Sequence, residues 1–110
     1  VVGGDLNSDL RSPELEILTR TDLTDFHDVI GTPKEERVSL VHFDYFGKPH
    51  PQVLDYLLVS PQLKSEILPE KSCTYRYKSF YDIPHPLPKT MTERHQMPSD
   101  HYPLVLTFRI

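Results

Sequence analysis

The chain has 110 residues and a mass of 12.8 kDa, and 37% of its residues are hydrophobic, which predicts a single folded domain with a modest core. One cysteine, Cys73, excludes an internal disulfide and a cysteine-based zinc site, and fits a reducing compartment such as the cytoplasm. A formal net charge of −4 excludes nucleic-acid binding by bulk electrostatics, and no apolar run approaches the roughly 18 residues of a transmembrane segment. Eleven prolines and the absence of alanine favour strands and loops over long helices.

The first third of the chain predicts a strand followed by a short helix. Residues 1–5 (VVGGD) are typical of a strand that ends in glycine, and without an initiator methionine they suggest the later part of a longer protein. Residues 12–14 (SPE) supply an N-cap, a proline at the first helical position and an acid in the first turn, which predicts a helix over 13–20. Residues 23–30 predict either a second helical turn or a surface connection.

The remaining two thirds predict mainly strands. Residues 38–46 (VSLVHFDYF) and 53–60 (VLDYLLVS) predict an antiparallel hairpin with its turn in the GKPHP segment between them, and residues 72–78 predict another strand. Residues 79–99 contain four prolines, which predicts a long loop without regular structure and with a functional or mobile role. The alternation in residues 104–110 predicts a last strand, whose core-facing residues are Leu104, Leu106, Phe108 and Ile110.

Asp5 and Asn7 form the first group that can carry chemistry. They follow the two glycines at the end of the first strand, and residues two apart in an extended segment point to the same side. A carboxylate and a carboxamide projecting together from a strand end suit a catalytic site. The alternative is a glycine turn followed by Asx-type capping of the next helix.

Asp55 is the second candidate, because it lies in a strand that is otherwise apolar on both faces. Burying an unpaired ionised carboxylate costs several kcal/mol, so we expect Asp55 either near a strand end or beside a partner such as a histidine. The alternative is a strand-edge aspartate that points to water.

Asp100 and His101 are the third candidate, an acid and a base on adjacent residues just before the last strand. Neighbouring residues in an extended chain point in opposite directions, so the two side chains are expected to serve different neighbours. One can face a metal while the other faces a substrate oxygen. The alternative is a polar loop with no site.

Taken together, GDLN at 4–7, LDYLLVS at 54–60 and SDHYPL at 99–104 resemble, in order and spacing, the C-terminal half of the endonuclease/exonuclease/phosphatase superfamily. That superfamily includes pancreatic-type DNase, abasic-site endonucleases, mRNA deadenylases, neutral sphingomyelinases and inositol-polyphosphate phosphatases. The resemblance implies an α/β (α+β) fold in which residues 1–110 are the C-terminal portion of a single domain. They would form half of a two-sheet DNase I-like sandwich, with mostly antiparallel strands and one or two short helices.

The resemblance also implies a role for each of five residues. Asp5 is similar to the aspartate that orients and deprotonates the attacking water, and Asn7 to the asparagine beside it that contacts the phosphate. Asp55 is similar to the acid that hydrogen-bonds the catalytic histidine, and His101 to that histidine, which donates to a phosphate oxygen. Asp100 is similar to an aspartate at or next to a divalent metal ion, Mg²⁺ or Mn²⁺.

The function implied by the resemblance is a Mg²⁺-dependent phosphoester hydrolase acting on a nucleic acid, a phospholipid or a sugar phosphate. The main metal-binding glutamate of the superfamily lies in the N-terminal half, which has no counterpart in this sequence. We therefore expect residues 1–110 to need that half as a partner and to be inactive alone. The alternative is a non-catalytic or split interaction module that binds a partner through an exposed sheet edge.

Arg76 and Lys78 are the predicted substrate contacts. Residues 1–70 carry 13 acidic and 6 basic residues, whereas residues 71–97 carry 2 and 5, so this is the basic part of an acidic chain. In YRYK the two cations alternate with tyrosines, a pattern that can hold a phosphate backbone and stack on a base, and in the superfamily this stretch lies beside the cleft. The alternative is a half-buried strand with tyrosines inward and cations in water.

The other polar side chains are expected at the surface. His42 and Asp44 would form a surface pair, and His27 would belong to a solvated face with Asp25 and Asp28. The remaining members of this solvated set lie in the proline-rich loop, and they are His85, Lys89, Arg94 and His95.

Overall fold

The computed structural model describes residues 1–79 and 81–109. Over these residues the strands are β1 (Val2–Asp5), β2 (Thr24–Asp25), β3 (Leu40–Phe43), β4 (Pro49–Gln52), β5 (Asp55–Val59), β6 (Cys73–Thr74) and β7 (Leu104–Val105). The α-helices are α1 (Glu16–Thr19), α2 (Phe26–Ile30) and α3 (Met91–His95), and the 3₁₀ helices are η1 (Pro13–Leu15), η2 (Lys34–Arg37), η3 (Pro61–Glu66) and η4 (Pro69–Lys71). Small antiparallel sheets with a few short helices place the chain in the α+β class.

The largest sheet has the strand order β1-β5-β2, with β5 between two antiparallel neighbours. Its apolar residues Tyr56, Leu58 and Val59 are buried, as expected for a central strand. The register places Val2 opposite Leu58 and Asp5 opposite Asp55, so both aspartates lie at the same end of the sheet. This end of β1 and β5 forms one wall of the site described below.

The hairpin in the middle of the chain differs from the one predicted. Strand β3 pairs with β4 and not with β5, so the prediction that residues 38–46 pair with residues 53–60 is wrong. The sequence favoured a turn at GKPHP because of its two prolines, yet proline is tolerated in an edge strand, where its missing N–H is not needed. The turn lies at residues 44–48 instead, and its Asp44 carboxylate accepts a hydrogen bond from His50 Nε2 at 2.8 Å rather than pairing with His42.

The last strand is confirmed in part. Strand β7 pairs with β6, and Leu104, Leu106 and Phe108 all pack against the core, whereas Val105 is exposed, as the alternation predicts. The expected core position of Ile110 lies outside the described residues.

Phe26, Val59 and Ile67 form the centre of the core, and α2 supplies the first of them. The solvated face expected around His27 is wrong for His27 and Asp25, which are 2% and 7% exposed, and correct for Asp28, which is exposed. The imidazole is buried without loss of hydrogen bonds, since Nδ1 lies 2.8 Å from the Thr32 hydroxyl and Nε2 lies 2.9 Å from the Thr74 hydroxyl. Asp25 caps α2 by accepting a hydrogen bond from the His27 N–H.

The two outer helical segments gave different outcomes. The helix predicted over 13–20 is present as η1 followed directly by α1. The proline-rich segment 79–99 was expected to lack regular structure, and α3 shows that this is wrong for part of it. Thr90 and Glu93 explain α3, because the Thr90 hydroxyl accepts from the Glu93 N–H and the Glu93 carboxylate accepts from the Lys89 N–H.

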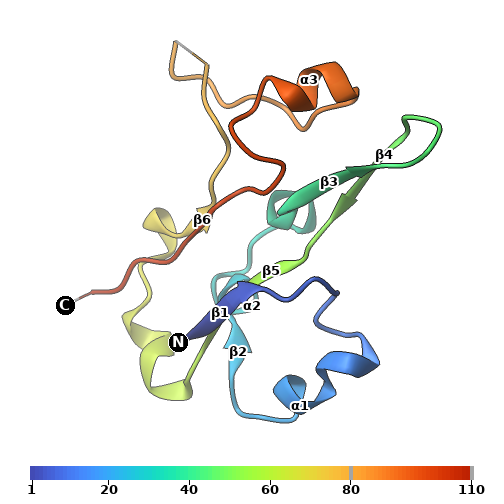
Figure 1. Ribbon diagram of the computed structural model, residues 1–110. Helices are drawn as coiled ribbons and strands as arrows, with labels where there is room; N and C mark the ends of the chain where they lie inside the picture. Colours follow the sequence, from blue (N-terminus) through green and yellow to red (C-terminus); the bar gives the residue numbers. More distant parts are fainter. Residues whose placement is uncertain (80, 110) are drawn as a thin grey trace.

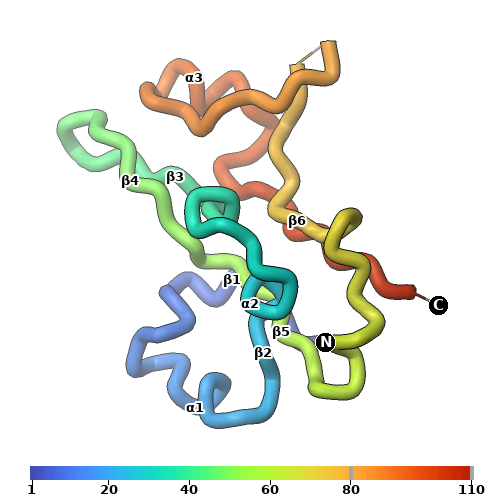
Figure 2. Tube along the Cα trace, turned by 180° about the vertical axis from the view of Figure 1, so that it is seen from behind, coloured from blue at the N-terminus to red at the C-terminus, as the bar shows by residue number. Residues whose placement is uncertain are grey.

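The molecule is flattened, with extents of 43 × 37 × 20 Å. Figure 1 shows the hairpin β3–β4 and helix α3 projecting from the end opposite α1, and Figure 2 shows the same arrangement from behind. The chain that leads into β7 passes between these two projections and the β1-β5-β2 sheet (Figure 1). Among the described residues, no helix has the length and apolar character needed to span a bilayer.

Candidate functional site

The site begins with two carboxylates on neighbouring strands. Asp5 is the last residue of β1 and Asp55 is the first residue of β5, and the antiparallel register sets them directly opposite each other. Directly opposed residues of a β-ladder place their side chains on the same face of the sheet. The pairing continues beyond them, because the Leu6 N–H donates to the Leu54 carbonyl at 2.8 Å.

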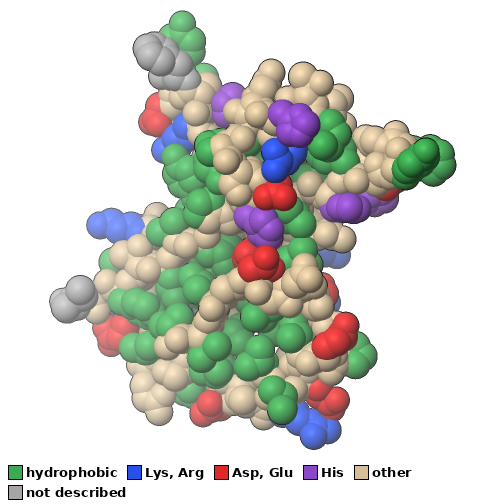
Figure 3. Space-filling model, in the orientation of Figure 1, with side chains coloured by type: hydrophobic (Ala, Val, Ile, Leu, Met, Phe, Trp, Pro, Cys, Tyr) green, Lys and Arg blue, Asp and Glu red, His purple; other side chains and the backbone are tan. Residues whose placement is uncertain are grey.

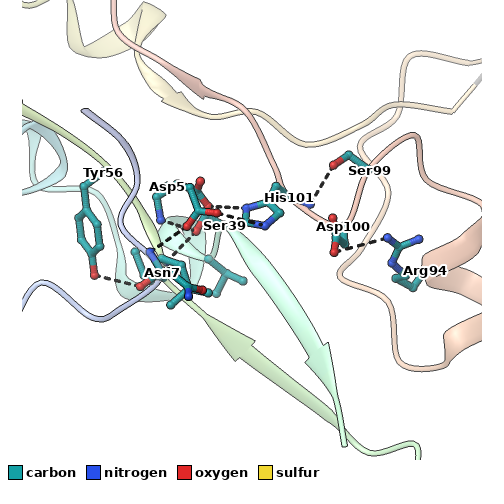
Figure 4. A network of polar contacts seen from close by, with 12 residues as sticks. Asp5, Asn7, Ser39, Tyr56, Arg94, Ser99, Asp100 and His101 are labelled. Carbon is teal, nitrogen blue, oxygen red and sulfur yellow. Dashed lines mark hydrogen bonds and ion pairs between the residues drawn. The ribbon is translucent and has the colours of Figure 1, made fainter. Parts of the chain in front are cut away.

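His101 contacts both carboxylates and comes from a segment far away in the sequence. Its Nδ1 lies 2.8 Å from Asp55 Oδ2, and its Nε2 lies 3.8 Å from Asp5 Oδ2 (Figure 4). The first distance is a hydrogen bond, whereas the second is too long for one and leaves room for an oxygen atom to contact both groups. A backbone bridge between His101 and Leu40 of β3 holds the segment against the hairpin.

The electrostatics of the cluster favour a positively charged ring. The hydrogen bond that the ring donates to Asp55 is the main reason why the pKa of His101 is raised, and the charges of Asp55, Asp100 and Asp5 act in the same direction, while partial desolvation opposes them. A cationic imidazole next to two carboxylates also offsets the repulsion between Asp5 and Asp55.

A cavity of about 440 Å³ lies beside the cluster. Asp55 and His101 line it together with Gly4 of β1 and Tyr77. Figure 3 shows acidic and histidine side chains meeting in the middle of this face. A larger hollow of about 590 Å³ lies next to β4 and is lined mainly by apolar groups, but it contains none of the clustered carboxylates or the imidazole. Asp55 and His101 thus line the smaller cavity, whereas Asp5 does not.

Asn7 is held close to Asp5 by the turn that follows β1. Its backbone N–H donates to Asp5 Oδ1 at 2.8 Å, and its φ of 52° is a left-handed conformation that asparagine tolerates. This is an Asx-type turn within the motif, but it does not cap the next helix, because the N-cap of η1 is Ser12, which makes no side-chain capping bond. One oxygen of Asp5 fixes the turn while the other lies toward the imidazole.

Asp100 points away from the cluster. Its carboxylate lies 3.6 Å from the guanidinium of Arg94 on α3 (Figure 4). Asp100 and His101 therefore point in different directions, as predicted for neighbouring residues of an extended segment. Arg94, which was expected to be solvated, is thus one of the groups that surround the site. The metal role of Asp100 stays a prediction.

The two predicted substrate contacts lie outside the lining of the smaller cavity. The Arg76 guanidinium donates to the Val38 carbonyl at 2.8 Å and covers the Tyr102 ring at 4.6 Å from its centroid. Lys78 lies 3.4 Å from Asp82 in an exposed ion pair. The contacts of Arg76 are made within the protein, so its side chain contributes to the fold. A substrate role for these two residues stays a prediction.

Sequence reasoning missed two residues that contact the site. Tyr77 lines the cavity and donates its hydroxyl to the His101 carbonyl at 2.9 Å, a contact between residues 24 positions apart in the chain. Ser39 is fully buried and accepts hydrogen bonds from the backbone of Leu54 and Asp55. No sequence signal marks Ser39, because its partners lie 15 and 16 residues further along the chain.

Three side chains offer ligand atoms for a metal ion. Asp5, Asp55 and His101 each present one such atom within 4.8 Å of the others, and they are the one cluster of this kind among the described residues. Two carboxylates and an imidazole can bind a divalent cation, but the bond between Asp55 and His101 uses one atom of each. The donor set therefore supports two uses, an acid–imidazole pair and a partial metal site.

Comparisons with known proteins add no relative to this picture. No protein-family model matches the chain, and neither the curated proteins nor the solved structures give a match. The function is therefore argued from the geometry of the site.

Proposed function

We propose that this chain is the C-terminal part of a divalent-metal-dependent phosphodiester hydrolase of the endonuclease/exonuclease/phosphatase type. The observation that carries the proposal is the position of His101, with Nδ1 bonded to Asp55 at 2.8 Å and Nε2 facing Asp5 at 3.8 Å. One carboxylate fixes the ring and its charge, and the opposite nitrogen is left beside a second carboxylate at a cavity. Phosphoester hydrolysis needs this combination, a base for water and a donor for the phosphoryl oxygens.

The proposed reaction uses the gap between Asp5 and His101. Asp5 takes a proton from a water molecule, whose oxygen forms a bond to phosphorus while the bond to the leaving ester oxygen breaks. His101 donates from Nε2 to a non-bridging oxygen and offsets the charge that develops there. Asp55 accepts from Nδ1–H, which fixes the orientation of the ring and favours its cationic form, and in that form Nε2 also carries a proton that it can donate to the substrate. The leaving oxygen takes a proton from solvent, and Asn7 contacts the phosphate.

Mg²⁺ or Mn²⁺ fits the oxygen atoms of the site better than its nitrogen atoms. Mg²⁺ usually takes only one or two protein carboxylates together with water and phosphate oxygens, and Asp5 and Asp100 offer such groups. Asp100 would then exchange its contact with Arg94 for the ion, and a further carboxylate from outside this chain would complete the site. When bound, the ion would supply positive charge to the phosphoryl group.

The proposal includes a second half of the domain that covers this one. Strand β1 pairs with β5, and its four residues are all exposed. Hydrophobic side chains gather over part of the face seen in Figure 3, and Val1, Val2 and Val105 are exposed. An uncovered strand edge next to apolar surface is unfavourable for an isolated sheet. These features support the proposal that residues 1–110 are half of a two-sheet DNase I-like sandwich.

The test is hydrolysis of bis-p-nitrophenyl phosphate by the full-length protein with Mg²⁺. We expect turnover that EDTA abolishes, and we expect His101→Ala to lower kcat by at least about 100-fold, because removing one charge-stabilising donor has an effect of that order. His42→Ala is the matched control, since His42 is an exposed histidine on β3 and should leave kcat unchanged. Comparison with p-nitrophenyl phosphate separates a diesterase from a phosphomonoesterase.

The alternative function, a non-catalytic interaction module, makes the opposite prediction. Turnover that is unaffected by His101→Ala or by EDTA would exclude the proposed site as its source. Absence of turnover in the full-length protein under all metal conditions would favour the interaction module.

A further inference from the structure

Ser39 lies at the junction of the segments that carry Asp55 and His101. It is 0% exposed, and its hydroxyl oxygen accepts hydrogen bonds from the N–H groups of Leu54 at 2.9 Å and Asp55 at 3.1 Å (Figure 4). A hydroxyl oxygen has two acceptor positions, and these two donors occupy both of them. The Ser39 side chain therefore holds the start of β5 from the side that β1 does not pair with.

The backbone of Ser39 holds the other side of the pair. Its carbonyl accepts from the Tyr102 N–H at 2.8 Å, and the next residue, Leu40, forms the bridge to His101. Its own N–H donates to the Gln52 carbonyl at 2.9 Å, which continues the β3–β4 pairing. Ser39 thus bonds to the residue that follows His101 and to the residue that bears the Asp55 carboxylate.

The chain just before Asp55 is paired on one side only, where β1 lies opposite Asp55 and the Leu6 N–H bonds to the Leu54 carbonyl. Residues 53 and 54 lie between β4 and β5 and belong to neither strand, and β2 pairs with β5 only at Leu58 and Val59. The Ser39 hydroxyl supplies acceptors for two backbone donors in this interval. A small movement of this segment would carry the Asp55 carboxylate directly with it, because Asp55 is the first residue of the strand.

We propose that Ser39 is a positioning residue for the Asp55–His101 pair. It is buried between the two segments that carry these residues and holds their side chains at hydrogen-bonding distance. The role rests on the proposed function, in which this pair presents Nε2–H to the phosphate. Ser39 does not contact substrate. It acts through the backbone of Asp55 and of Tyr102.

Ser72 provides a matched control in the same chain. It is also a buried serine, at 6% exposed, and its hydroxyl oxygen accepts from the Thr107 N–H at 3.0 Å while its hydroxyl donates to the Leu68 carbonyl. Ser72 therefore joins two backbone segments, as Ser39 does, but neither segment carries a residue of the Asp5, Asp55 and His101 cluster. Ser72→Ala should destabilise the fold without affecting the pair.

The first measurement is the ¹H resonance of the His101 Nδ1–H in the metal-free full-length protein labelled with ¹⁵N-histidine. A proton held between an imidazole and a carboxylate exchanges slowly and resonates far downfield, and its loss in His101→Ala assigns it. We expect Ser39→Ala to remove or shift this resonance and Ser72→Ala to leave it in place. An unchanged resonance in Ser39→Ala, equal loss in Ser72→Ala, or no such resonance in the wild type would overturn the proposal.

The second measurement is hydrolysis of bis-p-nitrophenyl phosphate by the same variants. We expect Ser39→Ala to lower kcat about 10- to 100-fold with KM within twofold, since a displacement of about 1 Å has effects of this order, and Ser72→Ala to keep both values. If Ser39→Ala does not fold, Ser39→Cys replaces it in the test, because cysteine has a similar size and a weaker acceptor atom. A shifted Nδ1–H resonance in Ser39→Cys would support the positioning role, and an unchanged resonance would overturn it. If the wild type hydrolyses no diester, the proposed function fails, while the resonance still decides whether Ser39 positions the pair.

Discussion

Asp5 and Asp55 carry like charges at directly opposed positions of two paired strands, which destabilises a sheet unless a cation lies close to both. His101 is next to both carboxylates, and the hydrogen bond that its Nδ1–H donates to Asp55 raises the pKa of His101 and so favours its cationic form. A positive charge on His101 therefore offsets the repulsion between the two carboxylates.

His27 is the opposite case, a histidine that the fold keeps neutral. Burial lowers the pKa of His27 from 6.5 to about 4, and the positive charge of Arg37 acts in the same direction. The pKa of His27 is lower in the folded state than in the unfolded state. The contribution of His27 to the free energy of unfolding is therefore fully present above pH 6.5 and is lost as the pH falls toward 4. Between pH 7 and pH 5 we expect the loss to be about 2 kcal/mol in the free energy of unfolding.

Urea denaturation of the wild type and of His27→Gln, followed from pH 7 to pH 5, measures this contribution. Glutamine keeps a polar side chain beside Thr32 and Thr74 but does not titrate, so the stability difference between the two proteins should shrink by about 2 kcal/mol on acidification. His101 has a raised pKa and acts in the opposite direction, but it is present in both proteins and cancels. A difference that stays constant with pH would contradict a buried neutral His27.

At the scale of elements, the sequence was informative about which segments are strands and less so about which strands pair. The sequence predicted the apolar strand β5 and the core-facing side chains of Leu104, Leu106 and Phe108, because buried positions of a strand are apolar and repeat at a fixed spacing. The partner of β3 could not be predicted from the sequence, since the two prolines of β4 favour a turn unless the strand is known to lie at the edge of a sheet. Pairing is decided by contacts between distant segments, which local composition does not record.

Gly3 controls the approach of β1 to β5. A Cβ atom at this position would collide with the Leu57 side chain and would lie 2.7 Å from the Tyr56 carbonyl oxygen, so Gly3→Ala must push the strands apart. We expect a loss of about 1–3 kcal/mol in the free energy of unfolding, as for other insertions into tightly packed positions. We also expect a lower kcat in the full-length protein, because Asp5 lies two residues further along the same strand.

Val2→Ala is the control for this strand, because Val2 is 45% exposed, lies opposite Leu58 and already carries a Cβ atom. It should change stability by less than about 1 kcal/mol and leave kcat unaltered. If Gly3→Ala had the stability and kcat of the wild type, the close packing of β1 on β5 would not be what positions Asp5.

At the scale of the whole molecule, the site draws on three segments of the chain that meet only after folding. The sequence indicated Asp5, Asp55 and His101 as candidates, and the structure brings these three together while turning Asp100 toward Arg94. The sequence could not indicate Ser39 or the bond from Tyr77 to the backbone of His101, because both residues act through hydrogen bonds between distant segments. Motifs therefore identified the side chains that can do chemistry, and the tertiary structure identified those that hold them.

The position of Arg76 also depends on contacts between segments that are distant in the sequence. Its guanidinium joins the Val38 carbonyl, before β3, to the ring of Tyr102, next to His101, so it connects two parts of the molecule that flank the site. Lysine cannot reproduce a planar group that donates from several positions and stacks on a ring. We therefore expect Arg76→Lys to lower the free energy of unfolding by about 1–3 kcal/mol, with KM for bis-p-nitrophenyl phosphate within twofold of the wild type.

Lys78→Ala gives the contrasting result if the basic stretch also contacts substrate. The Lys78 side chain is 41% exposed and its partner Asp82 is 84% exposed, so the ion pair between them contributes less than about 1 kcal/mol and thermal unfolding should hardly change. If the Lys78 ammonium group contacts the phosphate of the substrate, its removal should weaken substrate binding, and KM should rise severalfold. Measuring the melting temperature and KM for both variants separates the two roles. A rise in KM with unchanged melting temperature in Arg76→Lys would show that Arg76 serves the substrate and that its bonds to Val38 and Tyr102 are dispensable for the fold.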